Sequence, residues 1–540
     1  MPQKRRSLFV FPLIVLLFAL LGGFYGPRIQ VAAAATQADE LSKDVESFTK
    51  AYSLVEQNFA DPVNPDKSIY KGAIPEMLRT LDPHSNFFDP KEYAALRDDQ
   101  RGHYYGVGMM VGPRNGKTMV MAPFPGSPAY KAGIRPGDII SMVNDKPTDG
   151  LSTTEIADML KGPRGTQVKI VVSREGAEAP IAFTVIRDAI NRPSVTDAFW
   201  VQPGIAYLKI TAFNETTSKE LDDQMKRLGE NNVKGLVLDL RENPGGLLNE
   251  GVAVADHFLQ KGQTIVSHHG RSSPEKTYVA RNGNKGRDYP IVVLVNKYSA
   301  SAAEIVSGAL QDHDRAWILG ETTFGKGLVQ TVYPLSENTG LALTTAHFYT
   351  PSGRLIQRDY SNQSFYDYYT HQDGTTRNQL DVKMTDSGRT VYGGGGITPD
   401  QKYEAPKLDA FEIDLARKSA YFNFTRKYFG THDTHLPKDW MPDDATLVEF
   451  HDYLLKAPEG YNFTEGEFAQ DRDWVKRYLA REMYITAFNI DESDKVFAKT
   501  DPEVEAAVDA MPKARALVET AKKILVQRMS SQQASSLAKR

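Results

Sequence analysis

The spacing of apolar residues changes along the chain and divides it into regions. Residues 39–58 and 69–81 carry apolar side chains three and four positions apart, a spacing that predicts helices. In residues 102–187, short apolar runs alternate with Gly, Pro and Asn, which predicts a compact β domain. One helical run, at residues 153–160, interrupts these predicted strands.

From residue 191 to about residue 406, strand-like and helical runs alternate. The strand-like runs are 205–210, 236–240, 291–295, 317–319 and 341–346, and the helical runs are 218–228, 248–259 and 302–310. This alternation predicts a sheet layered with helices. The tail from residue 407 onward is predicted to be mostly helical, with Asp501-Pro502 at the start of one helix.

An uncharged stretch near the N-terminus has the character of an export signal. Basic residues precede it, and its apolar part covers about residues 8–25. That length exceeds the apolar part of most cleaved signals and barely spans a bilayer, so a cleaved signal peptide and a retained cytoplasmic-membrane anchor both remain open. In either case the body is expected outside the cytoplasm, in the periplasm or cell envelope, because the basic residues stay on the cytoplasmic side.

Composition excludes several classes of function. The chain has 540 residues, 41% of them hydrophobic, which is enough for more than one folded core. A formal net charge of -4 provides no basic field, so nucleic acid is not expected as a partner. The chain contains no cysteine. Disulfides, thiol nucleophiles and cysteine-based zinc sites are therefore excluded, and a covalent catalyst must be Ser, Thr or Lys.

The first candidate for chemistry is a serine at a strand-to-helix turn. The strand-like run 291–295 leads into Ser299-Ala-Ser301-Ala-Ala303, where a helical run begins. This turn leaves the Ser301 hydroxyl beside unpaired amides, which would stabilise a developing oxyanion. Serine needs a neighbouring base, but the chain has no Gly-x-Ser-x-Gly motif and no histidine in a recognisable protease motif.

Lysine is the alternative base. Lys326 is a lone charge among small and apolar neighbours, a setting in which burial lowers the pKa of an ammonium group. To act as a base near neutrality, its pKa must fall from about 10.4 to near 7, at a differential cost of about 4 kcal/mol. If this segment is a strand, Gln330 lies on the same side as Lys326 and could orient the amine.

Two glycine-rich segments have more than one interpretation. Residues 320–327 nearly match a phosphate-binding loop, but Gly327 replaces the magnesium-binding hydroxyl and a strand-like run follows, so nucleotide binding is not expected. Asn243-Pro-Gly-Gly246 follows the strand-like run 236–240. It is either a tight turn before a helix or the source of a second oxyanion-hole amide.

Taken together, these segments resemble the C-terminal processing peptidases, also called tail-specific proteases. The matching motifs are Leu81-Asp-Pro-His-Ser85, Tyr105-Gly-Val-Gly108, Gly133-Ile-Arg-Pro-Gly-Asp138, Leu240-Arg-Glu-Asn-Pro-Gly-Gly246, Ser299-Ala-Ser-Ala-Ala-Glu304, Phe324-Gly-Lys-Gly-Leu-Val-Gln330 and Gly396-Ile-Thr-Pro-Asp400. The resemblance implies a multidomain α/β (α+β) fold. In it, a PDZ-like β domain and a crotonase/Clp-like ββα protease core lie between helical N- and C-terminal regions.

The resemblance also implies a Ser/Lys mechanism. Ser301 would be the nucleophile, Lys326 the general base and Gln330 the residue that orients the lysine. The backbone amides of Ala302 and Gly246 would form the oxyanion hole.

Two parts of the chain fit the family less directly. Some descriptions of the family include an acidic residue in the relay, and Asp312 is its match here, although the segment is equally compatible with a solvated helix end. Residues 407–540 lie beyond the family motifs, and no role is assigned to them.

The resemblance identifies residues 101–188 as a PDZ domain. Its loop Tyr105-Gly106-Val107-Gly108 would present amides to the terminal carboxylate of a substrate, which would add as a strand beside the domain. A simple turn permitted by the two glycines is the alternative. The remaining implied boundaries are 1–35 for the signal or anchor, 36–100 for a helical region, 189–406 for the serine protease core and 407–540 for a C-terminal helical region.

No metal or cofactor is expected. His84 has no second ligand at a usable spacing, and His268 and His269 would point to opposite faces of a strand. The expected function is that of an exported serine endopeptidase, which cleaves envelope or secreted proteins recognised by exposed, apolar C-terminal tails. An inactive PDZ scaffold of the cell envelope is the alternative, and an oligomer or an adaptor is compatible with either function.

Overall fold

The structure is a computed structural model that describes residues 41–114, 116–361, 365–370 and 378–538. The chain forms two compact units, Met1–Thr80 and Leu81–Arg540. The predicted signal or anchor at residues 8–25 lies outside the described residues. Among the helices that are described, none combines the length and the apolar character needed to cross a membrane.

The first unit is helical where it is described. Residues 41–58 form a helix, and a π-helical segment, η1 (Asp66–Ala73), leads directly into α2 (Ile74–Arg79). The helices predicted from apolar spacing at residues 39–58 and 69–81 are therefore confirmed, with shifted boundaries.

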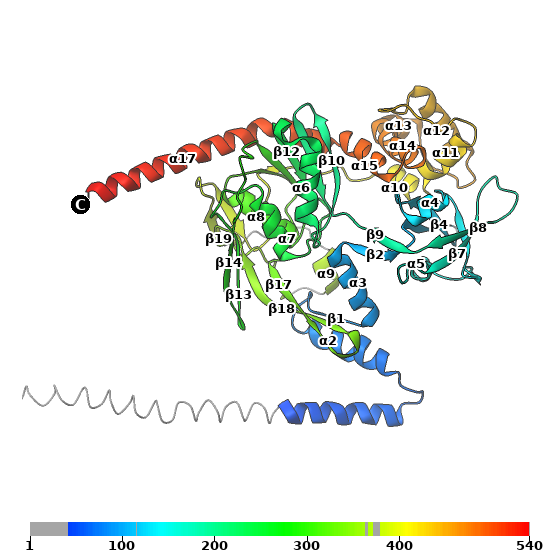
Figure 1. Cartoon of the computed structure of the whole chain (residues 1–540), viewed down its shortest axis with the longest axis horizontal. Coiled ribbons are helices and arrows are strands. Elements are labelled where there is room, and N and C mark those ends of the chain that lie inside the picture. Colours follow the sequence, from blue (N-terminus) through cyan, green and yellow to red (C-terminus); the bar gives the residue numbers. More distant parts are fainter. Residues whose placement is uncertain (1–40, 115, 362–364, 371–377, 539–540) are drawn as a thin grey trace, which may run out of the picture. The chain divides into compact units, whose positions relative to one another are not determined.

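The second unit begins with β1 (Asn86–Phe88) and α3 (Pro90–Arg101) and continues into the predicted β domain (Figure 1). The domain contains β3 (Met109–Arg114), β4 (Lys117–Pro123), α4 (Pro128–Ala132), β5 (Ile139–Val143), β6 (Lys146–Pro147), α5 (Thr153–Leu160), β7 (Gln167–Ser173) and β8 (Ile181–Ile186). Its sheet has the order β3-β4-β5-β7-β8, so β3 forms an edge. The strands that enter and leave the domain, β2 (His103–Gly106) and β9 (Asp188–Asn191), pair with each other.

A six-stranded sheet forms the centre of the second unit. Its order is β10 (Val195–Gln202), β11 (Ile205–Ile210), β12 (Gly235–Asp239), β15 (Ile291–Val295), β16 (Trp317–Gly320) and β21 (Gln401–Lys402). All pairs except β10 with β11 are parallel. The predicted alternation of strands and helices is therefore confirmed as a layered α/β arrangement.

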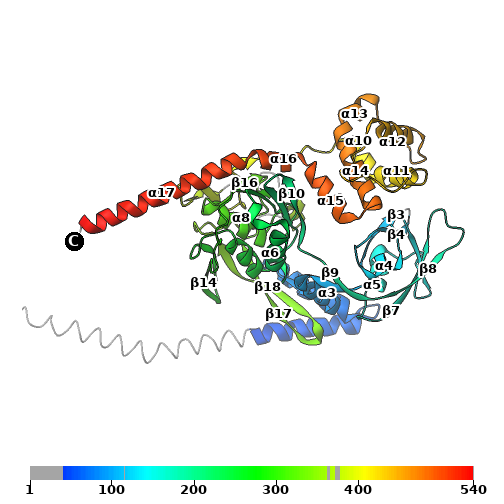
Figure 2. The same cartoon turned by 45° about the horizontal axis from the view of Figure 1, so that its top comes forward.

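Helices cover both faces of this sheet. One face packs against α6 (Thr217–Leu228), α7 (Leu248–Asp256) and α8 (Ala302–Asp312), and the other against α15 (Ile490–Lys499), α16 (Pro502–Asp509) and the start of α17 (Met511–Ala538). Leu236 and Leu238 of β12 face the first group, whereas Val237 faces the second. Because both faces are buried, β12 and β15 consist almost entirely of apolar residues. Figure 2 shows α16 near β10 and β16, and α17 continuing from it and extending away from the sheet.

A second sheet lies beside the first. It consists of β1, β13 (Thr264–Gly270), β14 (Ser273–Val279), β17 (Leu328–Pro334) and β18 (Gly340–Tyr349), with β18 pairing with β1, β13 and β17. The shorter elements nearby are η2 (Glu230–Asn232), η3 (Ser336–Asn338), α9 (Phe365–Thr370), β19 (Asn378–Met384) and β20 (Thr390–Gly393). This sheet places β17, which carries Gln330, directly after the Lys326 loop.

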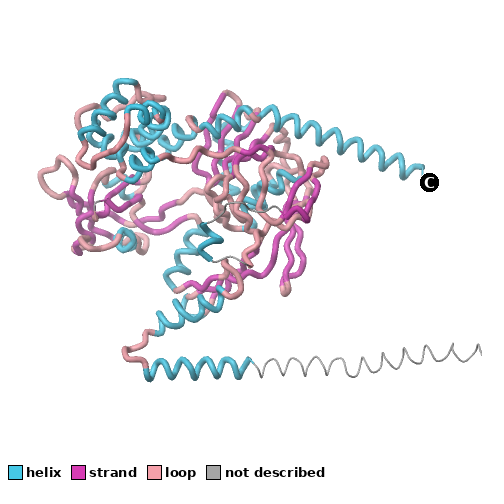
Figure 3. Tube along the Cα trace, turned by 180° about the vertical axis from the view of Figure 1, so that it is seen from behind, coloured by secondary structure: helices cyan, strands magenta, loops and turns pink. Residues whose placement is uncertain are grey.

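Residues 410–487 form a helical module with its own core. It contains α10 (Ala410–Arg417), α11 (Ala420–Phe429), α12 (Asp444–Lys456), α13 (Glu465–Gln470) and α14 (Arg472–Ala487). Aromatic side chains such as Phe424 and Phe450 fill its interior. Figure 3 shows that this module is built from helices, whereas the β domain is built mainly from strands. The chain then returns to the central sheet through α15, α16 and α17.

Candidate active site

Ser301 lies at a strained turn between β15 and α8. Its backbone has φ 53° and ψ -112°, a combination that non-glycine residues seldom adopt. The residues before it are fixed to another loop, since Ala300 N donates to Asn243 O at 2.9 Å and Ser299 Oγ donates to Leu240 O at 2.8 Å. The turn therefore presents Ser301 at the N-terminus of α8, as the sequence predicts.

The loop that follows β12 packs against this turn. Its two glycines, Gly245 and Gly246, have positive φ angles of 97° and 142°. A Cβ atom on Gly245 would lie 2.7 Å from the Cβ of Ser301, so only glycine permits this approach. The amides of Gly246 and Ala302 have no hydrogen-bond acceptor among the residues that the structure describes.

Lys326 lies in the loop between β16 and β17. Its side chain is largely buried, and burial lowers the pKa of its ammonium group, although Asp82 and Glu304 act in the opposite direction. Its Nζ donates to Gln330 Oε1 at 3.0 Å. Within the described part of the chain, no hydrogen bond joins Lys326 Nζ to Ser301 Oγ.

Glu304 brings the serine turn and the lysine loop together. Its Oε2 accepts from the backbone N of Ser301 at 2.8 Å and from the backbone N of Lys326 at 2.9 Å. Its Oε1 accepts from Thr323 Oγ1 at 2.5 Å and from Gly325 N at 2.7 Å. The carboxyl group is fully buried, which raises its pKa. The sequence carries a signal for this role, because Glu304 stands three residues after Ser301, where a capping-box glutamate would lie.

Gln330 is oriented by the turn at residues 82–85. Its Nε2 donates to the backbone O of His84, which leaves Oε1 for the lysine. Asp82 holds this turn by accepting from His84 N at 2.7 Å and from Ser85 N at 2.8 Å. The same carboxylate accepts from Thr344 Oγ1 at 3.1 Å, and Thr344 is the cross-strand partner of Gln330.

The His84 ring is a neutral part of this turn. Burial, followed by the charge of Lys326, lowers its pKa to about 4. Tyr368 OH accepts from Gln357 Nε2 at 3.3 Å and lies 3.0 Å from His84 Nε2, while Tyr369 OH donates to Pro83 O and lies 3.1 Å from His84 Nδ1. This pattern places the ring proton on Nδ1. The ring is thus held by two tyrosines and acts as a structural element.

Comparison with known proteins gives the family. The profile of peptidase family S41 matches residues 204–362, and that of a PDZ domain matches residues 119–174. A carboxy-terminal-processing protease from Bartonella bacilliformis is 42% identical over 54% of this chain and 68% of its own length. The chain belongs to the carboxy-terminal processing proteases of family S41. A carboxyl-terminal-processing protease from Synechocystis is 39% identical over 53% of this chain and 68% of its own.

A solved structure of a photosystem II D1 C-terminal processing protease is 28% identical. It covers 66% of this chain and 86% of its own, at a TM-score of 0.34. The family assignment confirms the resemblance found in the motifs. It also makes the chain a serine protease with a PDZ domain.

In this carboxy-terminal processing protease, Asp312 is not brought to the other predicted site residues. It is the last residue of α8, which begins at Ala302, so about 15 Å of helix separates it from Ser301. Its side chain accepts from Arg354 Nη2 at 2.5 Å and from Ser352 N at 3.0 Å. Asp312 therefore anchors the far end of α8.

In the predicted carboxylate loop of the PDZ domain, Tyr105 and Gly106 belong to β2 and pair with β9, so only Val107 and Gly108 form the loop that leads into the edge strand β3. Two backbone carbonyl oxygens of this loop accept hydrogen bonds from within the domain. Val107 O accepts from Ala129 N at 2.8 Å, and Gly108 O accepts from Ser127 Oγ at 2.7 Å. Gly108 has φ 77°, and a Cβ atom there would lie 2.5 Å from the Cβ of Ser127. Tyr105, in β2, is 39% exposed.

A second set of Ser, His and Asp residues lies on the central helices. Ser218 Oγ is 3.1 Å from His257 Nε2, and His257 Nδ1 is 3.3 Å from Asp222. Ser218 N is occupied by Glu250 Oε2 at 2.9 Å, so an oxyanion at Ser218 would meet a carboxylate instead of a donor. This set links α6 to α7 and lacks the features of a catalytic triad. No cluster suited to a metal ion occurs among the described residues.

Proposed function

We propose that this protease cleaves peptide bonds by acyl transfer to Ser301, with Lys326 as the general base and Gln330 as the residue that orients it. The neutral amine of Lys326 accepts the Ser301 proton as Oγ attacks the substrate carbonyl carbon. The amides of Gly246 and Ala302 donate to the oxyanion. The tetrahedral intermediate then collapses, the C–N bond breaks, and Lys326 returns the proton to the leaving amine. Water, deprotonated by Lys326, then attacks the ester carbonyl carbon. The bond from this carbon to Ser301 Oγ breaks, and Lys326 returns the proton to Oγ.

One observation carries this proposal: the buried Glu304 carboxylate binds the backbone N–H groups of both Ser301 and Lys326 on the same oxygen. Nucleophile and base are thereby held in one constellation, although they are distant in sequence. We propose that Ser301 Oγ and Lys326 Nζ form the catalytic hydrogen bond when substrate is bound. Such bonds often tighten only in the substrate complex.

We propose that the substrates are exported proteins with exposed, apolar C-terminal ends. The loop Tyr105-Gly106-Val107-Gly108 would receive the terminal carboxylate, and the edge strand β3 supports strand addition by the peptide. The basic start and the apolar residues 8–25 support export to the periplasm or cell envelope, with cleaved signal or retained membrane anchor as alternatives. The proposed domains keep the boundaries 1–35, 36–100, 101–188, 189–406 and 407–540.

The test is the digestion of an unfolded reporter that carries an apolar C-terminal tail. We expect the wild-type chain to cleave the free-acid form faster than the C-terminal amide, because the amide lacks the carboxylate that the PDZ loop would bind. Ser301→Ala and Lys326→Ala should each cleave neither form. Full activity of Lys326→Ala would exclude the dyad, and binding without cleavage by the wild type would favour an inactive scaffold.

A further inference from the structure

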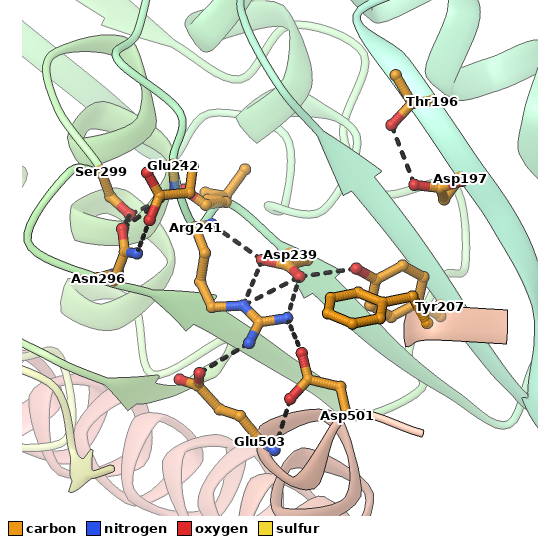
Figure 4. A network of polar contacts seen from close by, with 12 residues as sticks. Thr196, Asp197, Tyr207, Asp239, Arg241, Glu242, Asn296, Ser299, Asp501 and Glu503 are labelled. Carbon is orange, nitrogen blue, oxygen red and sulfur yellow. Dashed lines mark hydrogen bonds and ion pairs between the residues drawn. The ribbon is translucent and has the colours of Figure 1, made fainter. Parts of the chain in front are cut away.

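The segment before α16 and the first turn of this helix reach the loop that carries Gly246. Arg241, near the start of this loop, directs its guanidinium group toward three carboxylates (Figure 4). Its Nη2 lies 2.6 Å from Asp239 Oδ2 and 3.0 Å from Asp501 Oδ2, and its Nη1 donates to Glu503 Oε2 at 2.7 Å. Two of these three carboxylates come from residues far outside the region that the family profile matches.

The carboxylates are themselves fixed in place. Asp239 is buried at the end of β12 and also accepts from Tyr207 OH at 2.7 Å. Asp501 is the N-cap of α16, and its Oδ1 accepts from Glu503 N at 3.0 Å. Arg477 of α14 lies 3.4 Å from the other oxygen of Asp501. The guanidinium group of Arg241 is therefore held from two elements, β12 and α16.

Arg241 is coupled to the glycine loop through the backbone. Arg241 N donates to Asp239 Oδ1 at 2.9 Å. The next residue, Glu242, has φ 61°, and its N donates to Asn296 Oδ1 at 3.0 Å. Asn296 returns a hydrogen bond from Nδ2 to Glu242 Oε1 at 2.7 Å (Figure 4). A displacement of Arg241 would thus be transmitted to the turn that also carries Ser301.

Glu503 also lies against the start of the lysine loop. A Cβ atom on Gly320, the last residue of β16, would lie 3.1 Å from Glu503 Oε1. The loop from Gly320 leads to Lys326. Glu503 is therefore placed between the loop of the proposed oxyanion hole and the loop of the proposed base.

Apolar packing keeps α16 in this position. Val504, Ala507 and Val508 of α16 pack against the sheet residues Val292 and Leu294. Burial of these side chains favours one docked position for the helix. The ion pairs then act between groups whose backbones are already fixed.

We propose that Asp501 and Glu503 are positioning residues for the protease reaction. They hold Arg241, and through it the loop of Gly246, in the geometry that an oxyanion hole requires. The C-terminal segment that forms α16 thus completes the protease core. This inference rests on the proposed function for its effect on catalysis, but the anchoring of the loop can be measured without any substrate.

The test uses the full chain with the double substitution Asp501→Asn and Glu503→Gln. Both changes keep the shape of the side chains, and asparagine remains a good N-cap. We expect amide hydrogen exchange in residues 241–246 to accelerate by about tenfold or more while exchange in β12 stays unchanged. We also expect kcat on the tailed reporter to fall by about tenfold with KM unchanged, because only the transition state uses the hole.

Glu505→Gln is the matched control, since Glu505 lies on the same helix, is acidic and is exposed. It should leave exchange and kcat at wild-type values. Glu503→Gln alone provides a milder variant if the double substitution impairs folding. Unchanged exchange in residues 241–246 would overturn the inference. A wild-type chain that cleaves no reporter would overturn the proposed function, while the exchange comparison would still decide whether α16 fixes the loop.

Discussion

Ser301 adopts a strained backbone conformation, with φ 53° and ψ -112°. We expect Ser301→Gly to increase the free energy of unfolding by about 1 kcal/mol. The reason is that relief of a strain of about 1–3 kcal/mol exceeds the entropic cost of glycine, about 0.5–1 kcal/mol. Urea unfolding measures the change. Ser301→Ala is the control, because it keeps the strain and should not be stabilised; equal stability of the two variants would contradict the strain.

Lys326 is destabilising when charged, because burial lowers its pKa below the ordinary value for lysine. The penalty is complete below the folded-state pKa and disappears as the pH rises toward the ordinary pKa. Lys326→Met should therefore gain stability relative to the wild type at pH 6, and the gain should shrink as the pH rises to 10. Thermal denaturation across this range measures the difference. A difference that is independent of pH would show that the ammonium group is not desolvated.

At the scale of residues, sequence motifs select candidate side chains by residue type and spacing. Ser301, Lys326 and Gln330 have recognisable types at recognisable positions, and the structure places the last two within a hydrogen bond of each other. For Glu304 and Asp82 the sequence indicates only local contacts with backbone N–H groups three residues away. Their contacts with Lys326 N and Thr344 Oγ1 join separate segments of the chain. Such contacts depend on tertiary structure, which the sequence pattern does not contain.

At the scale of elements, α8 carries two carboxylates with different roles, Glu304 in its first turn and Asp312 as its last residue. Glu304→Gln should lower kcat by about 100-fold and cost about 1–3 kcal/mol of stability, because the amide introduces a donor opposite N–H groups. Asp312→Asn should weaken the contact to Arg354 and lower stability, but leave kcat per folded molecule unchanged. Active-site titration with steady-state kinetics separates the two effects. A loss of kcat in Asp312→Asn equal to that in Glu304→Gln would return Asp312 to the catalytic relay.

The sequence pattern predicted these elements well where they are amphipathic or wholly buried. The continuous apolar runs at 236–240 and 291–295 are strands with both faces covered. The pattern did not reveal that residues 407–540 divide into a separate module, residues 410–487, and helices that pack on the central sheet. Both parts show the same helical spacing, and only the partner that covers the apolar face distinguishes them.

At the scale of the whole molecule, ion pairs join the C-terminal helices to the protease core, and one of their members, Glu503, has a pKa near neutrality. Burial raises the pKa of Glu503 to about 7, against the attraction of Arg241. Asp239, Asp501 and Tyr403 are the other titratable groups that influence it. Below pH 7 the protonated Glu503 resembles glutamine. The ratio of kcat for the wild type to kcat for Glu503→Gln should therefore be near one at pH 6 and rise toward pH 8; a ratio that is independent of pH would exclude a role for the charge.

The proposed dyad of Ser301 and Lys326 can be tested directly through the rate at which a fluorophosphonate labels the serine. We expect mass spectrometry to locate a single adduct on Ser301 in the wild-type chain. The labelling rate should rise with pH through the lowered pKa of Lys326, because only the neutral amine accepts the serine proton. Lys326→Ala should label at least about 100-fold more slowly at pH 8. Equal labelling of Lys326→Ala and the wild type, or an adduct on another serine, would contradict the mechanism.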